Sequence, residues 1–303
     1  MAKATLLVLA AGLGSRYGGI KQMDPIGANG EFVLDYSMFD ALRAGFDKVV
    51  LVIRDELEEP LKEHFKALAG KVEIEYVKQR LTDLPAGFAC PEGRVKPWGT
   101  GHAIWSARNA VDSPFAAINA DDFYGAGTYK VLADFLLSDE CNPDTYAMVA
   151  FKLSNTLSEN GTVSRGICTD DGHGYLAGVV ERTSIEGYGD GARFMDDGGA
   201  WQPLTGSEPA SMNFWGFSPS LFGRLETLFV EFLKERGGEL KSEFYIPSVV
   251  DTLIKRGEVR ARMLQTNERW FGMTYADDRA QVVAKVRELT ASGLYPEKLW
   301  GAN

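Results

Sequence analysis

Cysteine and histidine are scarce in this sequence, and their scarcity excludes several kinds of site. Among 303 residues there are three histidines and three widely spaced cysteines, Cys90, Cys141 and Cys168, with no C-x-x-C pair. An odd, scattered set of cysteines predicts neither a disulfide framework nor a zinc site, and it suits a reducing cytoplasm. No His/Asp or Ser/His arrangement that would activate a nucleophile is evident either.

Long hydrophobic runs and an excess of positive charge are also missing. The early apolar run at residues 5–10 is too short to span a membrane, and it lacks the layout of a signal peptide. The net charge is −10, so no general attraction to nucleic acid or to an anionic membrane is expected. The expected partners are therefore small molecules, and a polyanionic substrate would need a local cluster of cations and backbone amides.

The first half of the chain alternates strand-length apolar runs with segments of helical spacing. The runs are residues 5–10, 48–53, 72–77 and 115–119, and the helical segments are 34–44, 57–68 and 102–111. This alternation predicts an α/β fold with a mainly parallel sheet covered by helices on both faces. In such sheets ligands bind at the carboxyl ends of the strands.

The composition and the spacing of apolar residues change after residue 152. Residues 160–206 are rich in glycine, aspartate and serine, with short alternating pieces such as 176–181, which predicts an antiparallel insertion at the ligand end. Helical spacing returns at 221–236, 246–256 and 277–292. With no repeat or linker visible, the prediction is one domain with halves at 1–152 and 153–276 and a C-terminal helix and tail at 277–303.

A glycine-rich loop follows the first expected strand. Residues 11–22 read AGLGSRYGGIKQ and hold four glycines with two cations, Arg16 and Lys21. Glycines let the backbone approach a ligand and turn its amides toward phosphate oxygens, and arginine suits bidentate phosphate contacts. Residue spacing excludes both a P-loop and the dinucleotide fingerprint. The alternative is a tight turn without a ligand.

The segment LAAGLGSR at residues 9–16, followed by Lys21, resembles the signature of the sugar-nucleotide pyrophosphorylase superfamily, L-A-A-G-x-G-[ST]-R and then a lysine. The resemblance implies a Rossmann-like, mainly parallel mixed sheet with a smaller antiparallel sugar-binding insertion. It also implies that the first half binds the nucleotide and the second half the sugar. Arg16 and Lys21 would act on the phosphates that leave. The loop residues implied to wrap a nucleoside triphosphate are Ala10, Ala11, Gly12, Gly14 and Ser15.

Two further motifs resemble the nucleotide-binding elements of this superfamily. Gln79 follows the strand expected at 72–77, and WGTGHA at residues 98–103 contains Gly99 and Thr100. By resemblance, the glutamine and the Gly-Thr backbone read the base, and a glutamine amide can pair with a pyrimidine edge. A solvated strand-end residue is the alternative for Gln79. We expect His102 to be structural.

Two acids follow the strand expected at 115–119. A carboxylate at the carboxyl end of a strand, beside an anion-binding loop, is well placed to hold Mg²⁺ together with substrate phosphates. The resemblance makes Asp121 the metal ligand and leaves Asp122 without an assigned role. The alternative is that both acids cap the next helix.

The later motifs point to a sugar phosphate. NGTVSRG at 160–166 includes Gly166, VVER at 179–182 includes Glu181, and SMNFWGF at 211–217 includes Asn213. By resemblance these three residues contact the sugar or the nucleotide-sugar. Two positions depart from the superfamily pattern: Arg182 replaces a lysine, and Gly272 stands where many relatives have a second metal-binding acid.

These motifs together predict a Mg²⁺-dependent nucleotidyltransferase that joins UTP or dTTP to a sugar 1-phosphate and releases pyrophosphate. The attacking phosphate is already an anion, so no general base is required. Two alternatives remain open. The short loop between Arg16 and Lys21, with Gln22, is similar to cytidylyltransferases that act on sugar-alcohol phosphates. The glycine at 272 slightly favours a nucleotide-sugar sensor without activity.

Overall fold

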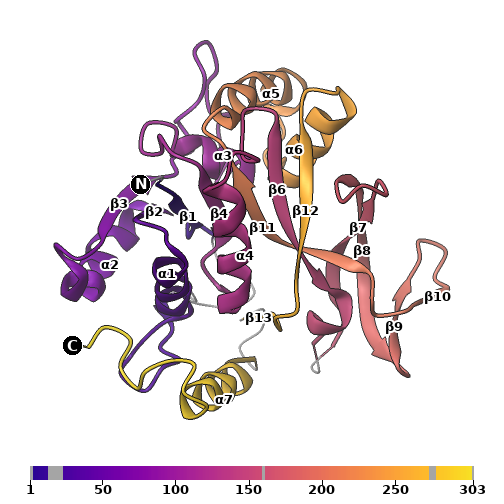
Figure 1. Cartoon of the computed structure of the whole chain (residues 1–303). Helices are drawn as coiled ribbons and strands as arrows, with labels where there is room; N and C mark the ends of the chain where they lie inside the picture. Colours follow the sequence, from indigo (N-terminus) through magenta and orange to yellow (C-terminus); the bar gives the residue numbers. More distant parts are fainter. Residues whose placement is uncertain (1–2, 13–22, 159–160, 273–277, 302–303) are drawn as a thin grey trace.

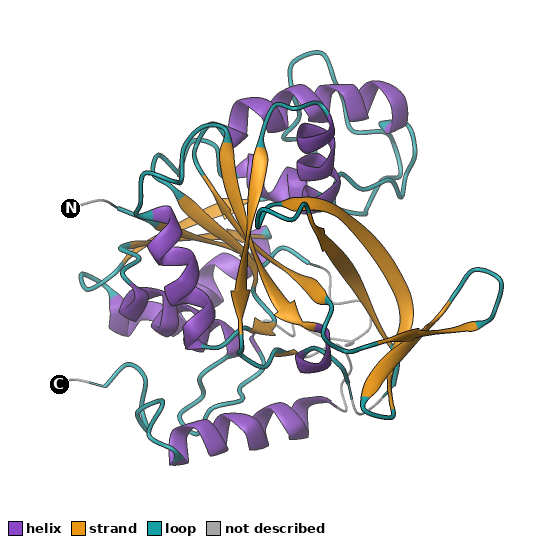
Figure 2. Ribbon diagram, turned by 45° about the vertical axis from the view of Figure 1, so that its right-hand side comes forward, coloured by secondary structure: helices purple, strands orange, loops and turns teal. Residues whose placement is uncertain are grey.

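A mixed sheet of eleven strands forms the centre of the computed structural model, with helices on both faces (Figures 1 and 2). The structure describes residues 3–12, 23–158, 161–272 and 278–301. The predicted α/β class is therefore confirmed. No helix within these ranges combines the length and the apolarity needed to cross a bilayer.

The parallel half of the sheet consists of four strands in the order β3-β2-β1-β4. Their bounds are β1 (Thr5–Leu9), β2 (Lys48–Ile53), β3 (Glu73–Lys78) and β4 (Phe115–Asn119). β2 and β4 have the predicted bounds, β1 ends one residue earlier than predicted, and β3 is shifted by one residue at both ends. β1, β2 and β4 are nearly continuous apolar runs because both of their faces are covered.

Each face of the sheet has its own layer of helices. Leu6 and Val8 point to one core with α1, α2 and α4, while Leu7 points to another with α3, α5 and α6. The helices of the first layer are α1 (Val33–Ala44), α2 (Glu58–His64) and α4 (Ala126–Leu136). Those of the second are α3 (Thr100–Ser106), α5 (Leu221–Arg236) and α6 (Ile246–Lys255).

Two predicted helices were wrong in extent. The segment expected as one helix at 57–68 divides into η2 (Asp55–Leu57), α2 and η3 (Phe65–Leu68), with a tight bond from the amide of Ala69 to the carbonyl of Lys66. The helix expected at 102–111 is α3, which starts two residues earlier and ends at Ser106. Beyond it the chain forms i to i−3 bonds, such as Ala110 to Ala107, which periodicity alone does not separate from helix.

β11 (Pro209–Phe217) joins the parallel half to the rest of the sheet. It runs antiparallel to β4 and to β6 (Thr145–Lys152), and β6 pairs in parallel with β12 (Arg260–Thr266). The amino-terminal part of β11 pairs instead with β7 (Val163–Asp170). The strands β8 (Leu176–Tyr188), β9 (Gly191–Met195) and β10 (Trp201–Leu204) continue outward from β7.

The antiparallel segment predicted after residue 160 is therefore confirmed as an arm, β7 to β10, that projects from the α/β body (Figure 1). It belongs to the same sheet because β7 pairs with β11. η4 (Leu153–Asn155) leads from β6 toward this arm, and Leu153 packs with Ile185 and Phe194 in a small core of its own.

The C-terminal segment packs beneath α1. β13 (Phe271–Gly272) pairs with β5 (Asp122–Phe123), and α7 (Asp278–Ala291) follows near the predicted place (Figure 1). Two residues of the tail then bond to buried carboxylates of α1. The Tyr295 hydroxyl donates to Asp40 at 2.8 Å, and the Trp300 indole donates to Asp35 at 2.5 Å.

We expect Tyr295→Ala to lower the free energy of unfolding by about 3–5 kcal/mol, the usual cost of removing a large buried side chain. Tyr295 is 2% exposed, whereas its neighbour Leu294 is 40% exposed and serves as the matched control. Leu294→Ala should cost less than about 1 kcal/mol. Urea denaturation of both variants measures the difference, and equal losses would show that the tail is not anchored through Tyr295.

Candidate active site

The carboxyl ends of the parallel strands meet at one edge of the sheet. The amide of Ala10 donates to Val52, that of Gln79 to Ile53 and that of Ala120 to Leu9. These bonds carry the strand pattern one step past β1, β3 and β4. Of the predicted loop residues, Ala10 and Ala11 are buried here and Gly12 is exposed. Gly14, Ser15, Arg16 and Lys21 lie outside the described residues.

A cavity of about 390 Å³ lies beside this edge, between β4, β7, β8, β11 and the start of α6. It brings together five residues that the sequence predicted from separate motifs. These residues are Thr100, Asp121, Gly166, Glu181 and Asn213. Gln79 and Gly99 are not in its lining, but Gly99 precedes Thr100 directly and accepts a hydrogen bond from Gln79.

Hydrogen bonds between polar side chains fix the floor of the cavity. Asp122 accepts from Asn119 at 2.8 Å and from the Tyr124 hydroxyl at 3.2 Å. Asn119 accepts in turn from Asn213 at 2.8 Å, and Asn213 accepts from the Trp215 indole at 3.0 Å. These hydrogen bonds give Asp122 a structural role, and they hold Asn213 against β4 at the wall of the cavity.

A chain of hydrogen bonds decides which way the Gln79 amide faces. His102 Nε2 lies 2.8 Å from the carbonyl oxygen of Asp83, and since a carbonyl only accepts, this nitrogen carries the proton. Burial lowers the pKa of His102 to about 4, so its ring is neutral and Nδ1 is an acceptor. Gln79 Nε2 lies 3.0 Å from this Nδ1 and 3.2 Å from the carbonyl of Gly99. Both amide hydrogens are thus engaged, and the oxygen Oε1 is the group that Gln79 can offer to a ligand.

Gly99 and Thr100 have clear structural reasons for their identities. Gly99 has φ +102°, and an added Cβ would come within 2.6 Å of the carbonyl oxygen of Phe244. Only glycine tolerates this close approach in that conformation. Thr100 Oγ1 accepts from the amide of Ile246 at 3.0 Å, at the first residue of α6.

Gly166 and Glu181 face each other across β7 and β8 as paired residues. A Cβ at Gly166 would lie 2.7 Å from Val179 Cγ1 and 3.5 Å from Glu181 Oε2, so the glycine keeps this part of the cavity open. Burial raises the pKa of Glu181, and the charge of Arg165 opposes that rise.

The residues of the cavity fit a divalent metal ion that arrives with substrate phosphates. Asp121 and Asp122 both line the cavity, and no cluster of three metal-binding side chains occurs among the described residues. An acid at 272 would not fit, because a Cβ there would lie 2.7 Å from both Asp122 Oδ1 and the Trp270 ring. Asp278 starts α7, as expected, and Asp277 lies outside the described residues.

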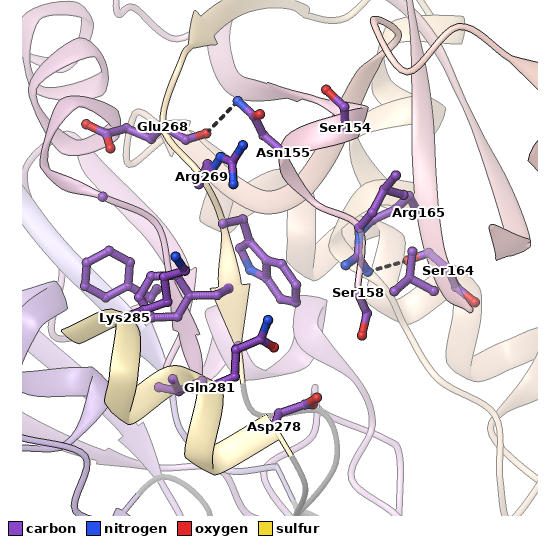
Figure 3. Close-up of a pocket in the computed structure, with 18 of the residues that line it drawn as sticks. Ser154, Asn155, Ser158, Ser164, Arg165, Glu268, Arg269, Asp278, Gln281 and Lys285 are labelled. Carbon is purple, nitrogen blue, oxygen red and sulfur yellow. Dashed lines mark hydrogen bonds between the residues drawn. The ribbon is translucent and has the colours of Figure 1, made fainter. Parts of the chain in front are cut away.

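A larger cavity of about 600 Å³ adjoins the first one (Figure 3). Ser164, Arg165 and Trp270 line both cavities, and the larger one extends between η4, β13 and α7. It contains none of the residues predicted to bind nucleotide, sugar or metal. We therefore place the candidate active site in the smaller cavity, at the carboxyl ends of the strands.

Several residues at the cavity were not predicted from the sequence. Asn119 was detectable, since it is a polar residue at the carboxyl end of a buried strand. Arg165 lies beside the predicted Gly166, but nothing local separates it from a solvated strand residue. Tyr245 and Trp270 reach the cavity through the packing of α6 and β13, which no local pattern indicates.

Known proteins resemble this chain in sequence and in fold. No family model matches the chain. It is 27% identical over 250 residues to a UTP–glucose-1-phosphate uridylyltransferase of Bacillus subtilis (strain 168), which covers 73% of this chain and 72% of that protein. The chain is therefore similar in sequence to a sugar-phosphate nucleotidyltransferase.

Two solved structures share the fold of this chain. The inositol-1-phosphate CTP transferase from T. maritima has a TM-score of 0.62 at 12% identity, with 95% of this chain and 98% of that chain covered. A UDP-glucose pyrophosphorylase complexed with UDP-glucose has a TM-score of 0.56 at 18% identity, with 95% and 99% covered. At these identities the likeness establishes the fold, which agrees with the Rossmann-like prediction.

We expect the neutral state of His102 to make stability depend on pH. The unfolded chain takes up a proton near pH 6.5, whereas the folded protein resists protonation down to about pH 4. The contribution of this residue is thus fully present above pH 6.5 and is lost as the pH falls toward 4, by about 3 kcal/mol. Urea denaturation between pH 7 and pH 4.5 measures it. His102→Gln should remove this part of the slope, and identical slopes in the two proteins would contradict the assignment.

Proposed function

We propose that this protein is a nucleotidyltransferase that joins UTP or dTTP to a sugar 1-phosphate, giving a nucleoside diphosphate sugar and pyrophosphate. One observation carries the proposal: a single cavity at the carboxyl end of β4 gathers the predicted metal-binding and sugar-binding residues with Thr100 of the base-reading motif. The uridylyltransferase of Bacillus subtilis, to which the chain is related, is named for this reaction with glucose 1-phosphate.

In the proposed reaction an oxygen of the sugar phosphate attacks the α-phosphorus of the triphosphate. The new P–O bond forms as the bond to the β-phosphate oxygen breaks, and pyrophosphate leaves with both bonding electrons. The protein mainly positions the two phosphates and neutralises charge. Asp121 would hold Mg²⁺, which supplies charge neutralisation at the phosphates. Glu181 would accept hydrogen bonds from sugar hydroxyls, and Arg16 and Lys21 would stabilise the leaving pyrophosphate.

The orientation of Gln79 supports a uracil or thymine base. Its Oε1 is the group available to a ligand, because His102 and Gly99 engage its amide hydrogens. Uracil and thymine carry a hydrogen on N3 that can donate to this oxygen, whereas N3 of cytosine is an acceptor. Two observations favour the alternative function, a cytidylyltransferase. They are the short loop between Arg16 and Lys21 and the fold shared with the CTP transferase.

We also place the enzyme in a reducing cytoplasm. Cys90, Cys141 and Cys168 are all free thiols, and burial raises the pKa of Cys141 and Cys168 to about 12. Thiols held in the protonated form react slowly with oxidants. This pattern suits a protein that neither forms disulfides nor uses a reactive cysteine.

A matrix of nucleoside triphosphates against sugar phosphates and sugar-alcohol phosphates tests the proposal. We expect pyrophosphate release with UTP or dTTP and a sugar 1-phosphate, and re-formation of the triphosphate when the product is incubated with pyrophosphate and Mg²⁺. Turnover confined to CTP and an alcohol phosphate would establish the second candidate. Binding of nucleotide-sugars without turnover across the whole matrix would instead indicate a sensor.

Asp121→Asn should lower kcat by a factor on the order of 10² to 10³ or more, since a charged group at the reacting phosphates is lost. The thermal midpoint should change little, because Asp121 lies at a strand end beside the cavity. Asp139→Asn, at an exposed position, is the control. Calorimetry of Mg²⁺ with the nucleotide-free wild type should show weak binding. Tight binding that survives Asp121→Asn would contradict the metal assignment.

A further inference from the structure

Arg165 is a cation in the wall of the candidate active site, and its hydrogen bonds to described residues all go to neutral groups. It extends from β7, where Nη1 donates to the carbonyl of Ser164 at 2.8 Å and Nη2 to that of Thr156 at 2.5 Å. Its guanidinium lies 4.5 Å from the centre of the Trp270 ring. Figure 3 shows Arg165 and its bond to Ser164 in the larger adjoining cavity, on the opposite side from Gln281 and Lys285. These contacts hold the side chain in place without neutralising its charge.

The charge of Arg165 has no counterion within the described ranges. No carboxylate oxygen there lies within ion-pairing distance of the guanidinium, and its Nε is buried without a hydrogen-bond partner among the described residues. Burial lowers the pKa of Arg165 to about 10, with Asp122 and Glu181 opposing the shift. Two of the five N–H groups are used, so donors remain. A partly buried cation without a counterion among the described residues is costly, which favours a site that an anion completes.

We propose that Arg165 binds the phosphate of the sugar-phosphate acceptor. The inference rests on the proposed function and deepens it. Arg165 belongs to the sugar side of the cavity: Gly166 follows it, and Glu181, the residue expected to bind sugar hydroxyls, is paired with Gly166 on β8. The triphosphate loop, in contrast, follows β1. A planar guanidinium also suits a phosphate, because it can donate two parallel hydrogen bonds.

Arg182, which stands in place of the superfamily lysine, does not lie in the wall of the cavity as Arg165 does. It is the pairing partner of Arg165 across β7 and β8, yet its guanidinium packs 4.5 Å from the centre of the Phe194 ring. Phe194 belongs to the small core of the arm, and Arg182 lines neither cavity. The cation for the acceptor therefore comes from β7 in this protein, one strand away from the place that the motif indicates.

Arg165→Met and Arg182→Met form a matched pair that tests this inference. Methionine keeps an unbranched side chain about as long as the aliphatic part of arginine and removes the charge. With glucose 1-phosphate as the acceptor and UTP as the donor, we expect Arg165→Met to raise the KM for glucose 1-phosphate about 10- to 100-fold, the loss typical of hydrogen bonds to a charged group. The KM for UTP should change less than about threefold. Arg182→Met should behave like the wild type in both measurements.

Calorimetric titration with glucose 1-phosphate gives a second readout that does not depend on turnover. The Kd should weaken for Arg165→Met by the same factor as the KM and should partly recover in Arg165→Lys, which keeps one charge without the planar fork. If the methionine variant fails to fold, Arg165→Lys takes its place in the test. Its single ammonium group should still bind glucose 1-phosphate more weakly than the arginine of the wild type.

The outcomes separate this inference from the proposed function. A wild type that turns over and an Arg165→Met variant with unchanged KM and Kd for glucose 1-phosphate would overturn the inference alone. A loss carried by Arg182→Met would overturn it as well. A wild type that neither turns over nor binds glucose 1-phosphate would overturn both.

Discussion

The site depends on the place where β11 changes partners. Its amino-terminal part pairs with β7, and its carboxyl-terminal part pairs with β4. Between them the register against β6 shifts, and Asn213 adopts φ +59°, which asparagine tolerates better than most residues. This break opens the sheet into a body and an arm. The cavity lies in the opening, with β4 on one side and β7 and β8 on the other.

Asn213 also links β11 to the end of β4 through its side chain. Its Nδ2 donates to Asn119 at the end of β4, which in turn donates to Asp122. Asp122 is thereby held beside Asp121 at the strand end, and Gly272 packs against its carboxylate. The missing acid at 272 follows from this packing: the space that its side chain would need is occupied by Asp122 and the Trp270 ring.

The cavity has an excess of negative charge, so it would bind an anion only if cations accompany that anion. Asp121, Asp122 and Glu181 line it, and Arg165 is the cation among its described lining residues. Phosphates would be repelled by three carboxylates unless cations accompany them. A divalent metal ion on Asp121 and the basic loop after β1 would supply that charge in the proposed reaction, and Arg165 would supply it on the sugar side.

Local patterns in the sequence were sufficient for the strands and the motif order. β2 and β4 were predicted with the right bounds because a buried parallel strand is a nearly continuous apolar run. α5 was predicted with the right bounds from its helical spacing. The helix ends near α2 and α3 were not, since 3₁₀ turns keep the same apolar spacing.

The site residues likewise divide into those that the sequence predicted and those that it did not. Asp121, Glu181 and Asn213 could be named from the sequence because each stands in a segment that resembles a motif of the superfamily, and all three line one cavity. Arg165 and Arg182 are both basic strand residues beside a motif glycine or glutamate, and the superfamily motif, with its lysine at position 182, points to Arg182. The tertiary structure decides between them: one guanidinium lies in the cavity wall, and the other packs on the ring of Phe194.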